Sequence, residues 1–182
     1  MDRQRIGAVL TAKSANGELR ELDPNAAGDH IDTLFRAACA MSGSRQIAED
    51  LVQETFVKVL ARPRFLRRDD DLGYLMRALR NTWYNHLRGE RVRRELTESE
   101  PQGADELPAR STHNDPHASM EATEVMAALK QLPQPYRETL AAVDVAGLSY
   151  AEAARALNVR QGTIMSRLHR GRDQLARSLQ SA

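Results

Sequence analysis

Near the C-terminal end of the sequence, a row of polar side chains has the types and the spacing needed to read a DNA duplex. Arginine neutralises phosphates and can bond guanine, while serine and threonine hydroxyls bond phosphates or base edges. A spacing of i, i+3, i+4 and i+7 places such residues on one face of a helix. The row, with the two polar residues before it, comprises Thr163, Ser166, Arg167 and Arg170, preceded by Arg160 and Gln161.

A solvated charged helix face is the alternative interpretation of this row. The charge is one-sided, because residues 160–173 contain four arginines and a single acidic residue, Asp173. A helix face that meets only water usually mixes both signs. We therefore favour a nucleic-acid contact.

The residues before the row predict the elements that must position it. Ser149 and Glu152 have the spacing of a capping box, so a short helix starts there. Asn158 tolerates the left-handed conformation that a tight turn needs, and the second helix follows at about Gln161. Residues 148–175 thus read as a helix-turn-helix whose inward residues are Ala153, Ala154, Leu157, Val159, Ile164, Leu168 and Leu175.

Nothing in the sequence has the spacing of a catalytic or metal-binding set. We find no nucleophile beside a base, no paired acids and no metal-ligand pattern. The single cysteine, Cys39, permits neither an internal disulfide nor a cysteine-rich zinc site, and it lies beside an apolar helical stripe. We therefore expect a buried, inert thiol, no cofactor, no metal and no enzyme activity.

Composition indicates a helical chain that is not inserted in a membrane. The 182 residues are 41% hydrophobic and 28% charged, but only 4% aromatic, so small helical cores are expected and a large aromatic cavity is not. No apolar run approaches the roughly 18 residues of a membrane span, and no leader is visible. These features predict a cytoplasmic protein.

The net charge of +1 hides two basic blocks separated by an acidic one. Residues 61–95 carry ten arginines against five acidic residues, and residues 149–182 carry six against two. Between them, residues 96–124 carry seven acidic residues and one arginine. This distribution predicts two nucleic-acid contacts joined by a linker that avoids DNA.

Two helices are predicted before the first basic block. Residues 30–41 carry an inward stripe, and a second helix runs from about Arg45 to Ala61 before Pro63. The stripe is Ile31, Leu34, Phe35, Ala38 and Met41, and the second helix turns Ile47, Ala48, Leu51, Val52, Phe56 and Val59 inward. The opposite face of the second helix mixes acidic and amide residues with an exposed valine, which suits either a protein partner or plain solvent. That face consists of Asp50, Gln53, Glu54 and Val57.

A third helix, from about Leu72 with Asp71 as its cap to about Arg94, separates two faces. The inward residues are Leu72, Leu75, Met76, Leu79, Trp83 and Leu87. The outward face interleaves arginine with tyrosine and asparagine, which suits unpaired bases and backbone phosphates. Its members are Tyr74, Arg77, Asn81, Tyr84, Asn85 and Arg88.

The remaining segments predict an all-α protein of two small helical domains. Residues 1–28 have little periodicity and read as a mobile or weakly helical extension, and residues 96–115 read as a flexible acidic linker. After the linker, Asp115 and Pro116 start a helix that leads to a break at Pro133 and Pro135. A further helix, closed by Gly147, completes the scaffold of the helix-turn-helix.

Five runs of the sequence resemble the extracytoplasmic-function sigma factors, group 4 of the sigma-70 family. GLSYAEAARALNV and GTIMSRLHRGRDQL resemble the second DNA-binding domain of that family, and AEDLVQETFVKVL resembles its RNA polymerase clamp-binding segment. YLMRALRNTWYNHLRGERVRRE and the preceding RPRFLRRDDD resemble its promoter-melting helix and specificity loop. The resemblance implies a sigma region 2 domain over residues 29–95 and a sigma region 4 domain over residues 116–182.

The resemblance also implies a function and its residues. The chain would bind core RNA polymerase through Asp50, Gln53, Glu54 and Val57, and would read the minus-thirty-five element of promoter DNA through Arg160, Gln161, Thr163, Ser166, Arg167 and Arg170. Asn81 and the loop 64–71 would hold a flipped base of the minus-ten element. The full set implied there is Arg64, Phe65, Arg67, Arg68, Arg77, Asn81, Tyr84, Asn85 and Arg88.

Two points stay open at the level of sequence. An anti-sigma factor is a further partner that the resemblance allows. The alternative function is a stand-alone helix-turn-helix regulator that binds an operator, which would leave the third helix and the acidic face around Asp50 without a role.

Overall fold

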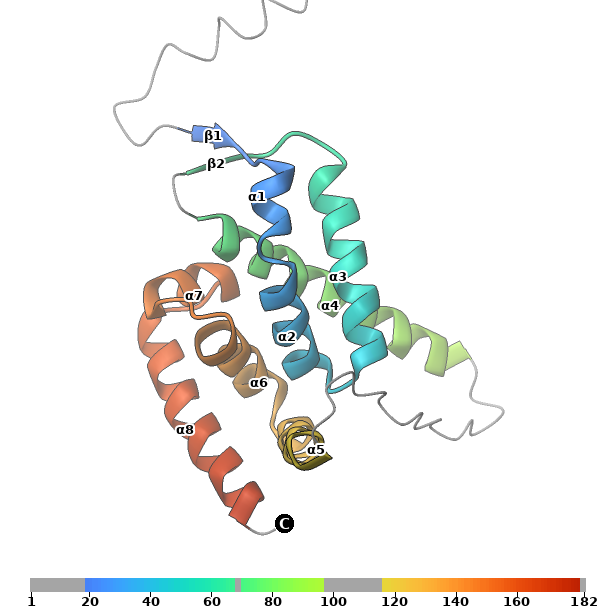
Figure 1. Cartoon of the computed structure of the whole chain (residues 1–182), viewed down its shortest axis with the longest axis vertical. Helices are drawn as coiled ribbons and strands as arrows, with labels where there is room; N and C mark the ends of the chain where they lie inside the picture. The colour runs from blue at the N-terminus through green and yellow to red at the C-terminus, as the bar shows by residue number, and fades with distance from the viewer. Residues whose placement is uncertain (1–18, 68–69, 97–115, 181–182) are drawn as a thin grey trace, which may run out of the picture.

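Helices make up most of the structure, a computed structural model that describes residues 19–67, 70–96 and 116–180 (Figure 1). The N-terminal unit, residues 19–96, contains α1 (Pro24–Gly28), α2 (Ile31–Ser42), α3 (Arg45–Leu60) and α4 (Asp71–Leu96). The C-terminal unit, residues 116–180, contains α5 (Pro116–Gln131), α6 (Gln134–Leu140), the π-helix η1 (Ala141–Val145), α7 (Tyr150–Leu157) and α8 (Gln161–Gln180). The predicted all-α, two-domain fold is confirmed.

Two short strands were not predicted from the sequence. β1 (Leu19–Glu21) pairs antiparallel with β2 (Phe65–Arg67), which belongs to the loop between α3 and α4. The predicted N-terminal extension therefore contains β1 and α1 in its described part, and its residues 1–18 lie outside the described residues. Most of the predicted linker, residues 97–115, lies outside them as well.

Local signals in the sequence explain where the first helices end and begin. Gly43 has φ 70°, a left-handed conformation that glycine adopts without steric cost, and it ends α2. Ser44 then caps α3 by accepting a hydrogen bond from the amide of Ile47. Two adjacent residues, Gly43 and Ser44, thus determine the turn between α2 and α3.

α2 is the central helix of the molecule. It contacts α3 and α4 of its own unit and α5, α6 and η1 of the other, and Figure 1 shows it between α3 and α6. It consequently buries more than one stripe, with Ala37 and Ala40 buried beside the predicted inward residues. The core of the N-terminal unit is built mainly from Leu34, Met41, Leu51, Leu75, Met76, Leu79 and Trp83.

Two predictions about individual residues were wrong. Ile31, expected inward, is 47% exposed because it lies in the first turn of α2 at the edge of an open groove. Tyr74, expected outward, is half-buried against the core. The predicted break between two helices is found at Pro133, the N-cap of α6, and Pro135 lies in the first turn of α6, where the N–H that proline lacks would have no partner within the helix.

The C-terminal unit packs α8 across α6 and α7. Leu140, Leu157, Ile164 and Leu168 are buried there, and Gly171 of α8 packs against α6, where an added Cβ would lie 3.3 Å from the Cβ of Tyr136. After α6 the backbone widens into η1, where the amide of Ala146 donates to the carbonyl of Ala141 (2.9 Å). The i to i+5 bond identifies a π-turn, which the apolar pattern of the sequence does not distinguish from an α-helix.

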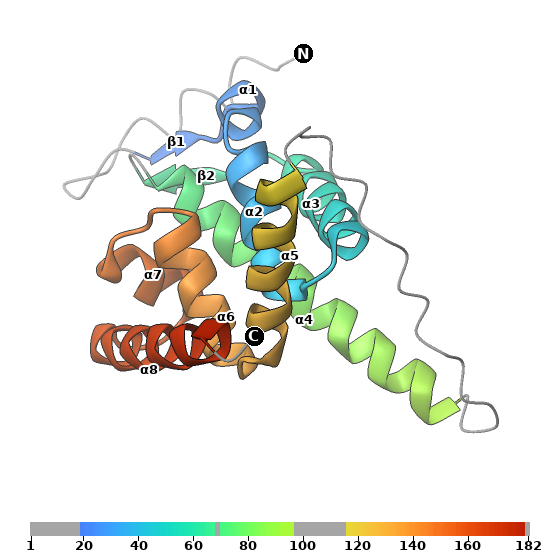
Figure 2. The ribbon, with the colours of Figure 1, turned by 60° about the horizontal axis from the view of Figure 1, so that its bottom comes forward.

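The two units pack against one another (Figure 2). Their buried side chains form one continuous apolar cluster, and α4 contacts α7. At this interface Arg80 Nε donates to Glu138 Oε2 (2.9 Å), and Glu138 is only 1% exposed. Gln134 Nε2 donates to the other carboxylate oxygen (2.8 Å). A buried carboxylate is therefore satisfied by one cation from the opposite unit and one amide from its own.

Replacing Arg80 with alanine should destabilise the chain and loosen the packing of the two units. Removing one partner of a buried ion pair costs about 3–5 kcal/mol, and the low end applies because the Arg80 side chain is 21% exposed. Denaturant unfolding measures the free energy, and small-angle X-ray scattering should show an increase in the radius of gyration.

Arg91→Ala is the matched control. Arg91 lies on the same helix in an ion pair with Glu95, but its side chain is 82% exposed, so the loss should stay below about 0.5 kcal/mol. Equal stabilities of the two variants would mean that the Arg80–Glu138 pair does not hold the units together.

Candidate functional site

The helix-turn-helix is formed as the sequence predicts. The Ser149 amide donates to Glu152 Oε2 (2.8 Å), and the Glu152 amide donates to Ser149 Oγ (3.3 Å), which completes the capping box of α7. The side-chain and backbone hydrogen bonds from Ser149 favour the ionised carboxylate and lower the pKa of Glu152. Asn158 has φ 53° and ends α7, and α8 begins at Gln161.

α8 presents the predicted polar row on the side away from its unit. Ile164 and Leu168 are buried below it. Arg160, Gln161, Ser166 and Arg170 are exposed, and Thr163 and Arg167 are half-buried. The six predicted side chains therefore occur together on one accessible surface, which we call the α8 face.

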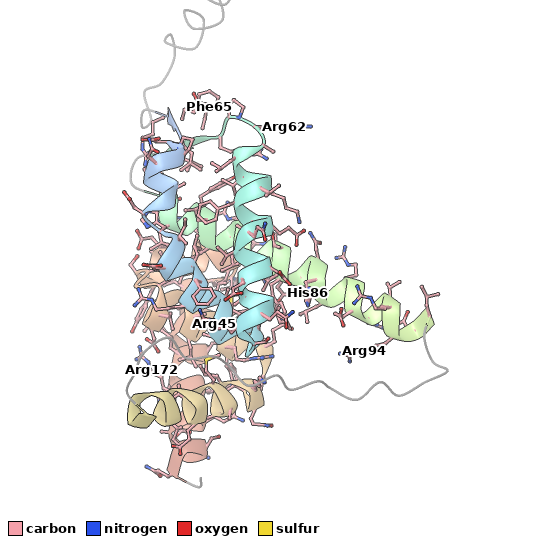
Figure 3. The ribbon with its side chains drawn as sticks, turned by 45° about the vertical axis from the view of Figure 1, so that its right-hand side comes forward. Arg45, Arg62, Phe65, His86, Arg94 and Arg172 are labelled. Atoms are coloured by element: carbon pink, nitrogen blue, oxygen red, sulfur yellow. The ribbon has the colours of Figure 1, made fainter. Side chains whose placement is uncertain are left out.

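Arg172, the remaining arginine beside this row, has a structural contact. Its guanidinium bonds Asp144 of η1, with Nε 3.0 Å from Oδ2, and this ion pair raises the pKa of Arg172. Figure 3 shows Arg172 pointing away from the α3 side of the molecule. Arg172 thus links α8 to η1.

The outward face of α4 is only partly free. Asn81, Tyr84, Asn85 and Arg88 are exposed along it, as predicted, and we call these four residues the α4 face. Figure 3 shows the C-terminal half of α4, which carries His86 and Arg94, projecting from the body of the molecule. Asn85 and Arg88 lie in this projecting half and face solvent.

Arg77, predicted on the same face, contacts the C-terminal unit. Its Nη2 donates to the carbonyl oxygen of Arg155 on α7 (3.0 Å), and the Arg155 guanidinium lies 3.7 Å from Asp70. One predicted DNA contact is therefore engaged by α7 in this arrangement.

Arg80, which the sequence analysis did not single out, connects the α4 face to Glu138. Its guanidinium also lies over the Tyr84 ring, 4.6 Å from the centroid. Partial burial, followed by the nearby Glu138 carboxylate, raises the pKa of Tyr84. No spacing signal could have identified Arg80, because its partner lies 58 positions away in the chain.

The loop between α3 and α4 is anchored at its middle. Leu66 is buried, whereas Phe65 is 53% exposed and Arg64 is also exposed. Figure 3 shows Phe65 and Arg62 at the same end of the N-terminal unit. Arg67 lies in β2, and the predicted contact Arg68 lies outside the described residues.

An apolar groove runs between α2 and α3. It is lined by Ile31, Asp32, Phe35, Glu49, Val52, Gln53, Phe56, Val57 and Leu60. Val57 is 64% exposed, Leu60 44% and Ile31 47%, which is unusual for large apolar residues on one side of a helix pair. Helical periodicity predicts the exposed Val57, but it places Ile31 inward and gives no signal for Leu60, because it does not show where two helices leave a groove open.

The predicted acidic face adjoins this groove. Gln53 and Val57 line the groove, and Asp50 and Glu54 are exposed on the same helix. Glu54 is paired with Lys58 (2.5 Å), one turn further along α3. The four predicted residues thus form an exposed surface, the α3 surface, whose apolar part continues into the groove.

The described residues contain no cluster of three or more histidine, cysteine or acidic side chains that could hold a metal ion. Burial raises the pKa of the Cys39 thiol to about 11, against the opposing effect of the nearby Arg45 guanidinium. A thiol with so high a pKa is a poor nucleophile at neutral pH, as expected. Among the described helices, none is long and apolar enough to cross a membrane.

Two family descriptions match the two units. Residues 27–93 match Sigma-70 region 2, and residues 122–175 match Sigma-70, region 4. The first match covers the groove, the loop and the α4 face, and the second covers the helix-turn-helix.

Curated relatives carry the same assignment. The chain is 36% identical over 177 residues to the ECF RNA polymerase sigma factor SigC of Mycobacterium tuberculosis, covering 96% of this chain and 90% of the relative. It is 34% identical over 147 residues to the ECF RNA polymerase sigma factor EcfG of Rhodopseudomonas palustris, covering 80% and 78%. It is 36% identical over 149 residues to the ECF RNA polymerase sigma factor SigE of Mycolicibacterium smegmatis, covering 80% of this chain but spanning only 57% of that relative.

Solved structures agree with the fold. The sigma factor RpoE of Bartonella quintana, in complex with the anti-sigma factor NepR, matches with a TM-score of 0.68 and 26% identity, over 86% of this chain and 95% of that one. CnrH in complex with the cytosolic domain of CnrY matches in fold, with a TM-score of 0.57 and 22% identity over 87% and 90% of the two chains. From both family matches and the extent of these alignments, the chain belongs to the extracytoplasmic-function RNA polymerase sigma factors of the sigma-70 family.

Proposed function

We propose that the chain binds core RNA polymerase and directs it to specific promoters. The observation that carries the proposal is the presence, in one chain, of a helix-turn-helix and of two further surfaces that an operator-binding regulator does not need. These are the apolar groove beside the α3 surface and the amide-bearing α4 face. We assign residues 29–95 to region 2 and residues 116–182 to region 4.

The α3 surface and the groove form the polymerase contact. Gln53 and Val57 supply its groove edge, and Asp50 and Glu54 supply negative charge beside it. A rim of charge around exposed apolar side chains is the composition of a protein interface. Apolar burial would provide affinity, while Asp50 and Glu54 would orient the partner.

The α4 face and the loop before it open the minus-ten region. Asn81 and Asn85 offer amides to base edges, Tyr84 and Phe65 offer rings for stacking, and Arg64, Arg67, Arg68, Arg77 and Arg88 offer charge to phosphates. Arg77 lies beside this face and donates to the Arg155 carbonyl in the packed arrangement, so a contact of Arg77 with DNA requires the two units to separate.

The α8 face reads the minus-thirty-five element as duplex. Arg160, Arg167 and Arg170 supply positive charge, and Gln161, Thr163 and Ser166 supply shorter polar groups along the same surface. A helix placed in the major groove reads sequence with such a mixture. The chain itself catalyses nothing in this scheme, since polymerase performs the chemistry, and it acts in the cytoplasm where polymerase works.

An anti-sigma factor is a further proposed partner. The Bartonella quintana sigma factor of the same fold is solved in complex with one. The groove between α2 and α3 would be available to such a protein while the two units are packed together.

Run-off transcription separates this function from operator binding. Purified core polymerase with this chain should produce specific transcripts from a cognate promoter, and core polymerase alone should not. A stand-alone regulator would give no specific initiation until another sigma factor is added, and that outcome would contradict the proposal.

Charge reversal at the α3 surface tests the polymerase contact. Asp50→Lys with Glu54→Lys should weaken binding to core polymerase while changing stability by less than about 0.5 kcal/mol per site, because both side chains are exposed. Affinity is measured by fluorescence anisotropy of labelled chain, and stability by thermal unfolding.

Asp29→Lys with Glu124→Lys provides a matched control, since both residues are exposed and acidic and neither lines the groove. The control should lose less affinity than the α3 variant. Normal polymerase binding by the α3 variant would remove Asp50 and Glu54 from the contact.

Replacing Asn81 with alanine tests promoter opening. Asn81 is exposed, so the variant should fold, bind polymerase and bind minus-thirty-five duplex normally. Unpairing a base costs a few kcal/mol, which the lost amide no longer helps to offset, so opening should fall on a closed template. On a template already mismatched at the minus-ten element the defect should shrink.

Permanganate reactivity of the non-template strand reports opening, beside the run-off yield. A residual defect on the mismatched template is expected if Asn81 also selects the flipped base. Normal opening of the closed template by Asn81→Ala would rule out this residue as part of the melting surface.

A further inference from the structure

The N-terminal segment 19–22 is joined to the loop that carries Phe65. β1 and β2 pair antiparallel, with Arg20 opposite Leu66 and Glu21 opposite Phe65. The ladder continues for one more bond, because the amide of Leu22 donates to the carbonyl oxygen of Arg64 (2.7 Å). Figure 1 shows this two-stranded ribbon at the end of the molecule, above α1 and beside the start of α4.

The pairing separates an inner from an outer side of the ribbon. Directly opposite residues of an antiparallel pair lie on the same face. Leu66 is buried in the core, so Arg20 shares the inner side, and exposed Phe65 shares the outer side with exposed Glu21. The register therefore determines that Phe65 faces solvent, since a slip by one residue would exchange the two sides.

Two anchors hold the ribbon in this register. Leu22 is 5% exposed and packs in the same apolar cluster as Leu66. On the inner side, the Arg20 guanidinium forms a hydrogen-bonded ion pair with Asp71, the first residue of α4. A two-stranded ribbon alone is only marginally stable in water, so these anchors decide whether β2 keeps its position.

The Arg20–Asp71 pair also connects the ribbon to the helix that carries Asn81. Asp71 is 6% exposed, and its other carboxylate oxygen has no hydrogen-bond partner among the described residues. Such a buried charge depends strongly on the cation beside it. Arg20 therefore connects three elements. It lies in β1, which pairs with β2, and its side chain bonds Asp71, the first residue of α4.

We propose that the segment 19–22, chiefly through Arg20, is a positioning element for minus-ten recognition. It fixes β2 relative to α4 and so sets the position of Phe65 relative to Asn81, two of the residues proposed to hold the flipped base. Arg20 is a positioning residue that acts through Asp71 and does not itself touch DNA. This inference rests on the proposed function of the loop in holding a flipped base.

The test measures base preference, which a merely stabilising residue would leave unchanged. Open-complex formation is compared across promoters that carry each of the four bases at each non-template position of the minus-ten element. Holoenzyme containing Arg20→Ala should lose preference at the captured base on the order of tenfold, since a misplacement of about 1 Å at a recognition site has an effect of this size or larger. Arg20→Lys should recover part of the preference, and polymerase affinity should stay unchanged.

Arg36→Ala is the matched control for charge, because Arg36 is an exposed arginine of α2 in the same unit. It should keep the wild-type preference. If Arg20→Ala does not fold at the assay temperature, Arg20→Gln, which keeps a polar side chain but removes the charge that pairs with Asp71, replaces it with the same expected direction. Wild-type preference in folded Arg20→Ala, or in Arg20→Gln where it replaces the alanine variant, would overturn the proposal.

Phe65→Ala separates failure of this inference from failure of the proposed function. If Phe65→Ala alters the preference and the Arg20 variant does not, the loop recognises the base without help from segment 19–22. If neither variant alters the preference, the loop does not hold the base, and both the loop assignment and this inference are wrong.

Discussion

The buried ion pair between Arg80 and Glu138 is the contact on which the packed arrangement of this chain depends. Moving an unpaired carboxylate out of water costs several kcal/mol, so Glu138 at 1% exposure requires a partner. Its own unit supplies the hydrogen bond from the Gln134 amide and the nearby Arg137 guanidinium, and the hydrogen-bonded cation comes from α4 of the other unit. The interface is thus specific as well as apolar, since sliding one unit along the other would leave the buried Glu138 carboxylate without the Arg80 guanidinium.

The same pair links the stability of the interface to the chemistry of the α4 face. Arg80 lies over the Tyr84 ring, and burial together with the Glu138 carboxylate raises the pKa of that tyrosine, so one cluster contains a structural anchor and a proposed base-stacking side chain. Arg77 is engaged nearby by the Arg155 carbonyl. Residues that contact DNA in the proposed open form therefore satisfy protein groups in the packed form, and separation exchanges one set of partners for another.

Sequence reasoning succeeded where the determining contacts are local. The capping box of Ser149 and Glu152, the left-handed Asn158 and the start of α8 follow from spacings of a few residues, and all were found in the structure. The exposed residues of the α3 surface and of the α8 face follow equally from helical periodicity. Periodicity describes one helix at a time, which is also why it placed Ile31 inward, although this side chain lines an open groove.

Long-range partners could not be derived in this way. The ribbon joins residues more than forty positions apart through backbone hydrogen bonds, and such bonds cannot be recognised from the pattern of side chains in the sequence. The Arg80–Glu138 pair joins two arbitrary charged positions among many in a chain that is 28% charged. The π-turn of η1 differs from an α-helix by a single hydrogen-bond register, and its apolar residues fit either geometry.

The two proposed DNA surfaces consequently differ in how they depend on the packing of the units. α8 contacts α5, α6 and α7 of its own unit, and the exposed residues Arg160, Gln161 and Arg170 take part in none of the hydrogen bonds found between the units among the described residues. The α4 face shares a cluster with Glu138, and its neighbour Arg77 is bonded to α7. Duplex reading by α8 is therefore compatible with the packed arrangement, whereas a DNA contact by Arg77 competes with it. Since binding can shift an equilibrium only through a difference in affinity for its two states, the bonds that Arg77 forms with DNA must be more favourable than the bond to Arg155 that they replace.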